Sequence, residues 1–210
     1  MICLNSGGSE ELNILLRREG MDELSDSQIT KFETYLDLLL KWNQRMNLTA
    51  VRDRIGILTR HFVECIACAR ALPHGLETVL DFGSGAGLPG VPIAICRPEI
   101  TVTLAESQAK KAGFLNEAVR VLHLRAGVFT GRAETINTAF DCVTLRAVDK
   151  MDDAVRCASS LISGRGYLAV MTTTRAVEEV TLTAGNRFKW DVPITLPGSD
   201  LGVVLFGSLK

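Results

Sequence analysis

The chain has 210 residues, a formal net charge of −1, and 47% hydrophobic and 22% charged residues. This length predicts one domain, or one domain with a small extension, and the composition is typical of a globular protein. The net charge excludes a strongly basic field over the whole molecule, so binding to nucleic acid would require a local patch. No apolar run approaches the roughly 18 residues that a membrane span needs, and no signal peptide stands out, so we expect a cytoplasmic protein.

Helix signals dominate the first 75 residues. Ser25 and Gln28 have the spacing of a capping box, and hydrophobic residues follow at helical spacing from Ile29 to Leu40. A loop is predicted over 49–54 and a further helix over 55–71, which ends before Pro73-His74-Gly75. We therefore assign residues 1–75 to an N-terminal helical extension.

From residue 76 onward, predicted strands and helices alternate. The strands are 77–82, 101–106, 127–131, 140–145 and 166–171, and the helices are 89–97, 108–124, 150–162 and 174–182. Such alternation predicts a parallel sheet with right-handed crossovers. Two last strands, 188–195 and 201–208, are joined by a Pro-Gly-Ser-Asp turn and predict a β-hairpin. We expect an α/β domain over 76–210, with a seven-stranded, mostly parallel sheet and a C-terminal hairpin, the layout of Rossmann-like class I methyltransferases.

The most informative segment is the loop after the first strand, which has four glycines in the eight residues from Gly83 to Gly90. Glycine permits a positive φ and lets a ligand approach the backbone closely. A helix behind the loop directs free N–H groups and its positive dipole end at that ligand. A tight turn without a ligand is the simpler interpretation, but so many glycines cost chain entropy. We therefore predict a cofactor site here.

Two cofactors fit the spacing. The segment Gly85–Gly90 matches the G-x-G-x-x-G fingerprint of dinucleotide binding, and Glu106 follows 21 residues after Gly85, where a ribose-binding acid is expected. S-adenosyl-L-methionine also takes a carboxylate at this position. Asp81 adds a negative charge beside the loop, which favours the cationic amino group of S-adenosylmethionine over a phosphate. S-adenosylmethionine is therefore predicted, and a nicotinamide-dependent oxidoreductase is the alternative.

Several motifs together indicate a family. They are Lys41-Trp42-Asn43, Asn47-Leu48-Thr49-Ala50, Arg60-His61-Phe62, the loop Asp81–Gly90, Arg97-Pro98, Gly131-Arg132-Ala133-Glu134, Phe140-Asp141 and Arg146-Ala147-Val148. In order and spacing, over roughly residues 28–172, the chain resembles the bacterial 16S ribosomal RNA guanine-N7 methyltransferases of the small subunit, the glucose-inhibited division protein B family. The resemblance implies an enzyme that forms 7-methylguanosine and acts on 16S ribosomal RNA or the small ribosomal subunit.

The resemblance also implies a cofactor site. It places Gly83 and Leu88 in the loop, Ala133 and Glu134 against the adenine, and Arg146 beside the methyl-transfer site. The glycine loop and the strand ends described above add further candidates. Together, the candidate cofactor-binding residues are Asp81, Gly83, Gly85, Leu88, Glu106, Ala133, Glu134 and Arg146. Asp81, Glu106, the 131–134 turn and Arg146 are expected at the carboxyl ends of strands, where ligands of open α/β sheets bind.

Arg146 is also the catalytic candidate, because it could hold a phosphate or orient the target base. A structural arginine paired with a carboxylate at the sheet end is the alternative. The chain departs from the family's pattern at Leu145, where a small polar residue is usual, and at Met171–Thr174, where a lysine is usual.

RNA contact is predicted for the helix–loop–helix that precedes the sheet. The candidates are Arg45, Asn47, Arg52, Arg54, Arg60 and His61. A solvated charged face is the alternative for the arginines, and a structural role or a proton-transfer role is the alternative for His61. Lys110, Lys111 and Arg120, on the helix after Glu106, are expected to face solvent, and RNA contact is the alternative for them.

The predicted reaction requires no general base, because guanine N7 has a free lone pair and no proton. The chain shows no base-and-nucleophile pair, and Leu145–Val148 replaces the Asn/Asp-Pro-Pro-aromatic motif typical of transfer to exocyclic amines. A non-catalytic RNA-binding module with this fold is a further alternative.

Cys65-x-x-Cys68 has metal-ligand spacing, but it falls within a predicted helix with no second pair nearby. We expect structural thiols, no metal and a monomer.

Overall fold

The computed structural model describes residues 8–210, so Cys3 lies outside the described part of the chain. Its helices are α1 (Gly8–Arg18), α2 (Asp26–Asn43), α3 (Arg54–Ile57), α4 (Glu64–Ala71), α5 (Gly90–Cys96), α6 (Ala109–Val121), α7 (Met151–Ala158) and α8 (Val177–Ala184). Its strands are β1 (Thr78–Phe82), β2 (Thr101–Glu106), β3 (Ala126–Thr130), β4 (Phe140–Arg146), β5 (Ile162–Thr173), β6 (Phe188–Trp190), β7 (Ile194–Thr195) and β8 (Gly202–Leu209).

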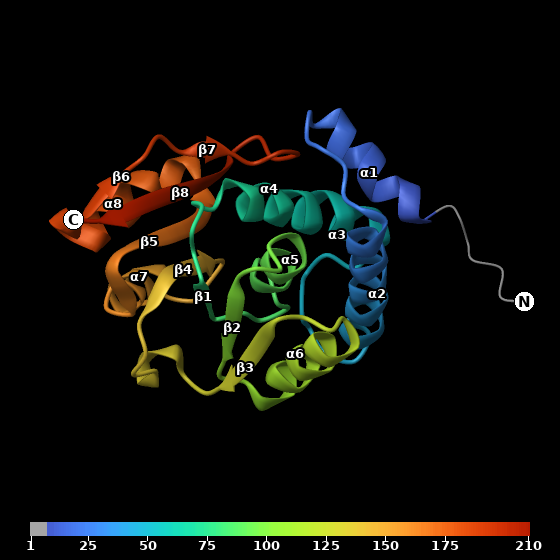
Figure 1. Ribbon diagram of the computed structural model, residues 1–210, viewed down its shortest axis with the longest axis horizontal. Helices are drawn as coiled ribbons and strands as arrows, with labels where there is room; N and C mark the ends of the chain where they lie inside the picture. The colour runs from blue at the N-terminus through green and yellow to red at the C-terminus, as the bar shows by residue number, and fades with distance from the viewer. Residues whose placement is uncertain (1–7) are drawn as a thin grey trace, which may run out of the picture.

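The strands form one sheet in the order β3-β2-β1-β4-β5-β8-β6, with β7 also paired to β8 (Figure 1). The pairs among β1 to β5 are parallel, and β8 is antiparallel to β5, β6 and β7. The mostly parallel sheet with a C-terminal hairpin is therefore confirmed. The predicted strand 188–195 is divided into two short strands, because Pro193 between them has no N–H to donate to a ladder.

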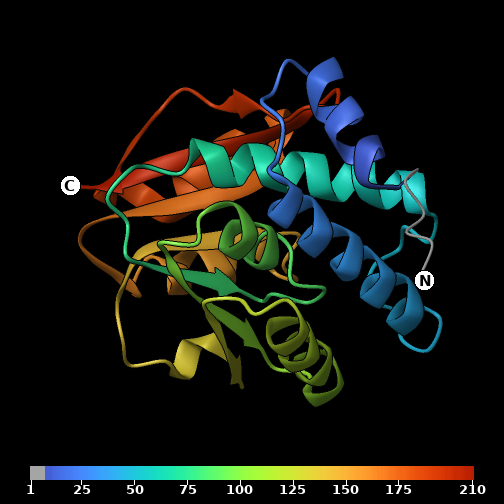
Figure 2. The ribbon, with the colours of Figure 1, turned by 45° about the vertical axis from the view of Figure 1, so that its right-hand side comes forward.

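Alternate residues of the central strands face two hydrophobic clusters. Val79, Val102 and Cys142 face α2, α4, α5 and α6, whereas Leu80 and Val143 face α7 and α8. Figure 2 shows α4 lying along β5 and β8, two strands that are distant from it in sequence. This period-two alternation is what a sheet covered by helices on both faces requires.

The N-terminal helices pack directly on the sheet domain. The capping box of Ser25 and Gln28 is present at the start of α2, as the sequence predicts. Residues 55–71 form a nearly continuous helix, but a π-helical segment, Leu58–Val63, separates α3 from α4. One hydrophobic cluster crosses the predicted boundary at residue 75, and the division into an extension and a domain stays a prediction. Among residues 8–210, no helix has the length and apolarity that crossing a bilayer would require.

Candidate functional site

A cleft of about 660 Å³ lies at the carboxyl ends of β1, β2 and β4. Its wall combines the glycine loop, the start of α6, the turn after β3, the loop after β4, and the segment that precedes α3. It is lined by Leu48, Thr49, Ala50, His61, Phe82–Ala86, Leu88, Ala105–Gln108, Lys111, Gly131–Glu134 and Arg146–Lys150. The cleft therefore brings together Gly83, Gly85, Leu88, Glu106, Ala133, Glu134, Arg146 and His61 from the sequence prediction.

Glu106 fixes the glycine loop from the end of β2. Its Oε2 accepts a hydrogen bond from the Gly85 N–H at 2.9 Å, and its Oε1 accepts one from the Gln108 N–H at 2.7 Å. The side chain is buried, yet it lines the cleft. A carboxylate held this way presents oxygen acceptors to the cleft.

Asp81 differs from the prediction. It is 1% exposed and does not line the cleft, because it shares the α5-facing side of β1 with Val79. Its carboxylate accepts hydrogen bonds from the Gly90 N–H at 3.2 Å and the Thr144 hydroxyl at 3.0 Å. Burial raises the pKa of this carboxyl to about 6, although these hydrogen bonds lower it. Asp81 supports the loop from beneath instead of presenting its charge to a ligand.

Tyr35 of α2 is a site residue that the sequence prediction missed. It is fully buried, and its hydroxyl donates to the Ala86 carbonyl of the glycine loop at 2.5 Å. Its ring stacks on Phe62 with centroids 5.2 Å apart. The apolar spacing of α2 marks Tyr35 as buried, but it does not indicate which loop the hydroxyl reaches.

The cleft fits S-adenosylmethionine. A Cβ built on Gly85 would meet nothing closer than the Gly83 carbonyl oxygen at 3.8 Å, so the loop backbone faces open space. Ala133 and Glu134 lie in a 3-10 turn opposite the loop and provide a small apolar contact beside a carboxylate. Glu106 supplies hydroxyl acceptors. These are the groups that an adenosine with a methionine tail would need.

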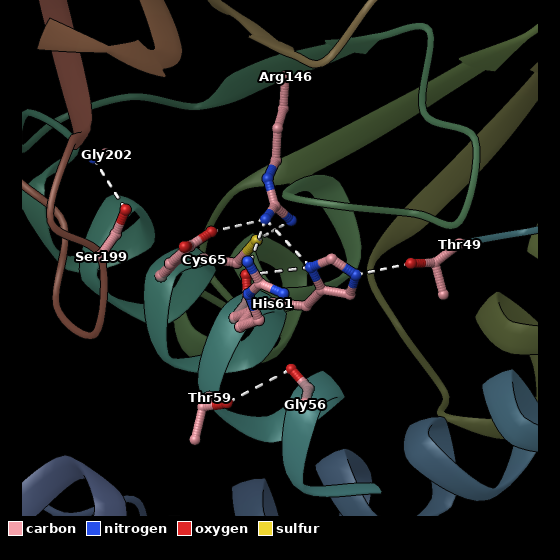
Figure 3. A network of polar contacts seen from close by, with 10 residues as sticks. Thr49, Gly56, Thr59, His61, Cys65, Arg146, Ser199 and Gly202 are labelled. Carbon is pink, nitrogen blue, oxygen red and sulfur yellow. Dashed lines mark hydrogen bonds and ion pairs between the residues drawn. The ribbon is translucent and has the colours of Figure 1, made fainter. Parts of the chain in front are cut away.

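Arg146, at the end of β4, is 15% exposed in its side chain and forms a polar network with the helical segment 60–65 (Figure 3). Nη2 lies 2.6 Å from the Glu64 carboxylate and donates to the Arg60 carbonyl at 2.9 Å. Nη1 donates to the Cys65 sulfur at 3.3 Å. The arginine is thus paired with a carboxylate, which the sequence alternative proposed, but the carboxylate comes from α4 and not from the sheet end.

His61 lies between the cleft and this network. Its Nδ1 is 3.1 Å from Arg146 Nη2, and its Nε2 is 2.7 Å from the Thr49 hydroxyl (Figure 3). Burial and the neighbouring guanidinium lower the pKa of His61 to about 4. The imidazole is therefore neutral at physiological pH. Glu64 shows the opposite effect, because burial raises the pKa of its carboxyl more than Arg146 lowers it.

The predicted RNA-binding residues do not form one group. Arg45, Asn47, Arg52 and Arg60 are exposed, and Arg52 donates to the Asn47 side chain at 2.7 Å. Arg54 instead pairs with Glu11 at 2.8 Å and Glu33 at 2.9 Å. This is a correction for Arg54: two carboxylates neutralise its charge, and it joins α1 to α2.

The thiols of the Cys-x-x-Cys pair are buried in the α4 face of the core. Burial raises the pKa of Cys65 to about 12 and raises that of Cys68 as well, so both are neutral. Within residues 8–210, no three His, Cys, Asp or Glu side chains gather as a metal site would require.

The sequence prediction also did not include the part of the loop after β4 that follows Arg146. Ala147 and Lys150 have φ values of 49° and 54°, in the left-handed region that non-glycine residues seldom adopt. The loop lines the cleft from Ala147 to Lys150. No turn signal in the sequence marks these positions, because neither residue type favours that conformation.

Comparison with known proteins identifies the family. A family model described as rRNA small subunit methyltransferase G matches residues 28–190. A protein named ribosomal RNA small subunit methyltransferase G from Xanthomonas campestris is 41% identical over 170 residues, which cover 79% of each chain. The protein of that name from Roseiflexus is 38% identical and covers 83% of this chain and 80% of its own.

Solved structures show the same fold at low identity. An O-methyltransferase from Bacillus cereus, solved in complex with SAH, superposes with a TM-score of 0.63 at 14% identity, over 96% of this chain and 100% of that one. A predicted O-methyltransferase from Agrobacterium tumefaciens has a TM-score of 0.59 at 20% identity, over 70% of this chain and 80% of its own. The fold is that of class I methyltransferases, and the chain belongs to the family of rRNA small subunit methyltransferase G.

Proposed function

We propose that this protein transfers a methyl group from S-adenosylmethionine to N7 of a guanine in 16S ribosomal RNA of the small subunit. The observation that carries the proposal is the cleft, where the glycine loop, Glu106 and Arg146 meet in a chain of this methyltransferase family. A nicotinamide-dependent oxidoreductase is not favoured, because the relatives named above are methyltransferases. A monomer in the cytoplasm, without a metal, belongs to the same proposal.

The cofactor supplies an electrophilic methyl group when it is bound. Gly83, Gly85 and Leu88 would contact it along the loop, Glu106 would accept from its ribose hydroxyls, and Ala133–Glu134 would contact its adenine. Asp81 would hold the loop from beneath through the Gly90 N–H. Preorganised contacts of this kind align the reacting atoms and supply much of a transfer rate.

The guanine would enter between the segment Leu48–Ala50 and the loop after β4. N7 carries a lone pair and loses no proton, so the neutral imidazole of His61 has no proton to remove. Arg146 would orient the base or an adjacent phosphate through Nη1, because the Nη2 hydrogens already bind Glu64 and the Arg60 carbonyl. Glu64 and His61 would then position the guanidinium.

The test is methylation of small ribosomal subunits from a strain that lacks this enzyme class, with isotopically labelled S-adenosylmethionine. We expect 7-methylguanosine in a nuclease digest of the 16S RNA, at one site. Arg146→Ala should lower the single-turnover rate more than the affinity for S-adenosylmethionine. Label on an exocyclic amine or a ribose would contradict the N7 proposal, and RNA binding without label would favour a non-catalytic module.

The rate should also be nearly flat with pH. Under saturating RNA and cofactor, no titrating base should limit single-turnover transfer from about pH 6.5 to 8.5. A steep acidic limb that disappears in His61→Ala would assign proton transfer to the histidine and contradict the mechanism.

A further inference from the structure

A second hollow, of about 420 Å³, lies between the C-terminal turn of α2 and the first half of α6, two helices that Figures 1 and 2 show side by side. It is lined by Lys41, Trp42, Arg45, Met46, Lys110 and Gly113. None of these residues has a role in the cofactor cleft.

The floor of the hollow is apolar and rigid. Trp42 is half-buried, its Nε1 donates to Glu117 at 2.9 Å, and its ring meets Phe114 edge-on at 5.7 Å between centroids. These contacts fix the plane of the indole before any ligand arrives. Because Nε1 already has a partner, the indole offers the hollow an apolar ring surface, and Met46 adds a polarisable side chain.

On the α6 side, the wall of the hollow includes Gly113, which has no side chain to occupy the space. A Cβ built on Gly113 would meet no heavy atom within 4 Å. Glycine in the middle of a helix is unfavourable relative to alanine. The helix therefore has an opening at this position that no packing contact requires.

The rim carries only positive charge. Lys41, Arg45 and Lys110 are exposed, and in the part of the chain that the structure describes, none of them has an ion-pair partner. Among residues 8–210, no carboxylate lines the hollow. Three cations around an apolar ring, in a protein of net charge −1, are complementary to a nucleotide: a base for the ring and phosphates for the rim.

The hollow and the cleft share two chain segments. Arg45 and Met46 line the hollow, and Leu48 to Ala50 line the cleft. Lys110 lines the hollow, and the next residue, Lys111, lines the cleft. If a guanine of an RNA chain entered the cleft, the neighbouring nucleotides of that RNA would pass the basic rim of the hollow.

We propose that this hollow binds one unstacked nucleotide of the RNA substrate, near the guanine to be methylated, with its base on Trp42 and its phosphates at Lys41, Arg45 and Lys110. The proposal rests on the function proposed above. Recognition of single-stranded RNA by stacking on aromatic rings inside a basic groove is the chemistry expected of such a site.

The experiment uses Trp42 as the reporter. The chain has two tryptophans, so in a Trp190→Phe background all tryptophan fluorescence comes from Trp42. We titrate this protein with an adenosine hexanucleotide and, separately, with heparin as a polyanion without bases. We expect saturable quenching by the RNA and little by heparin. Equal quenching by both, or none by the RNA, would overturn the proposal.

Two substitutions at one position give the matched control. Gly113→Leu should fill the hollow and weaken binding of the hexanucleotide by about 5- to 150-fold, the range expected for loss of one stacked base. Gly113→Ala leaves the hollow open and should bind within about twofold of the parent, an allowance for the context dependence of single contacts. Both should bind S-adenosylmethionine equally, as measured by calorimetry. If Gly113→Leu binds RNA as well as Gly113→Ala does, the hollow is not the base site.

This assay does not depend on methyl transfer. One outcome is that the RNA quenches Trp42 in a way that Gly113→Leu abolishes, while the protein methylates no small subunit. That pair of results would support the nucleotide site and reject the proposed function. Methylation of small subunits without quenching of Trp42 would support the proposed function and reject the nucleotide site.

Discussion

Two of the three glycines with a positive φ in the loop after β1 leave room for different neighbours. Gly85, with φ of 55°, faces the cleft, whereas Gly87, with φ of 86°, faces the core. A Cβ on Gly87 would lie 2.8 Å from Val91 Cγ2 and 3.0 Å from the Tyr35 hydroxyl. Gly85 therefore leaves room for a ligand, and Gly87 leaves room for α2 and α5.

We predict opposite phenotypes for valine at these positions. Gly85→Val should abolish binding of S-adenosylmethionine while lowering the free energy of unfolding by only about 1–2 kcal/mol, the cost of the left-handed backbone. Gly87→Val should add an overpacking cost of about 1–3 kcal/mol. Calorimetric binding and urea unfolding of both variants measure this. Cofactor affinity equal to the parent's in Gly85→Val would place the site elsewhere.

His61 predicts a dependence of stability on pH. Its pKa is about 4 in the folded protein, below the ordinary value of 6.5. The unfolded chain therefore binds more protons between these values, so the free energy of unfolding falls as the pH falls from 6.5 toward 4. Asp81 acts in the opposite sense, because its raised pKa of about 6 favours the folded state as the pH falls.

The variant His61→Gln isolates the histidine's share. Relative to the parent, it should gain about 2 kcal/mol of stability on going from pH 7 to pH 5, because glutamine has no proton to exclude. Urea unfolding at the two pH values gives the difference. A parallel loss of stability in parent and variant would show that the imidazole is not held neutral by the fold.

At the scale of elements, Arg54 differs from the other arginines of its segment, because it joins two helices. Four arginines occur between Arg45 and Arg60, and the sequence treats them alike. Folding places Arg54 between Glu11 of α1 and Glu33 of α2, whereas Arg52 stays exposed beside Asn47. Which arginine meets a carboxylate depends on how α1 crosses α2, and no local pattern encodes that crossing.

Alanine variants should separate these roles. Arg54→Ala should lower the free energy of unfolding by up to about 1 kcal/mol, as for partly exposed ion pairs, and leave the salt dependence of RNA binding unchanged. Arg52→Ala should preserve stability and reduce the log–log salt slope by about 0.7–0.9, the loss of one phosphate contact. A reduced log–log salt slope in Arg54→Ala would show that Arg54 contacts the RNA.

Most elements follow from local patterns. The helix α2 starts at the capping box of Ser25, and β1, β2 and β4 end within a residue of the predicted positions. The strand β5 is longer than predicted, because its first residue, Ile162, pairs with Phe140 of β4 across an irregularity in register. The π-helical segment Leu58–Val63 carries Arg60 and His61 toward Arg146, and hydrophobic spacing alone does not distinguish it from an α-helix.

For the whole molecule, the helices before residue 75 and the sheet share one core. Cys65 and Cys68 of α4 belong to the same cluster as Met171, Val204 and Phe206. The sheet domain alone would expose this face to water. The two parts are therefore expected to depend on each other for stability.

We predict that the full chain unfolds in one cooperative transition and that residues 76–210 alone do not fold. Scanning calorimetry of the full chain should give equal calorimetric and van't Hoff enthalpies. The isolated segment should show amide proton resonances with the poor chemical-shift dispersion of an unfolded chain. A folded 76–210 segment would instead support the sequence-based division into an extension and an independent domain.

The sequence by itself determined the order of strands and helices, the glycine loop, Glu106 at the next strand end and the family. These depend on local patterns: period-two and helical spacing, turn residues, and a loop-to-acid distance fixed by one βαβ unit. Only the tertiary structure decided that Asp81 lies beneath the loop, that Tyr35 holds it from α2, that Glu64 and His61 surround Arg146, and that a basic hollow lies at Trp42. Those contacts join residues up to 85 positions apart, and their partners are set by how helices pack across the sheet, which no local pattern specifies.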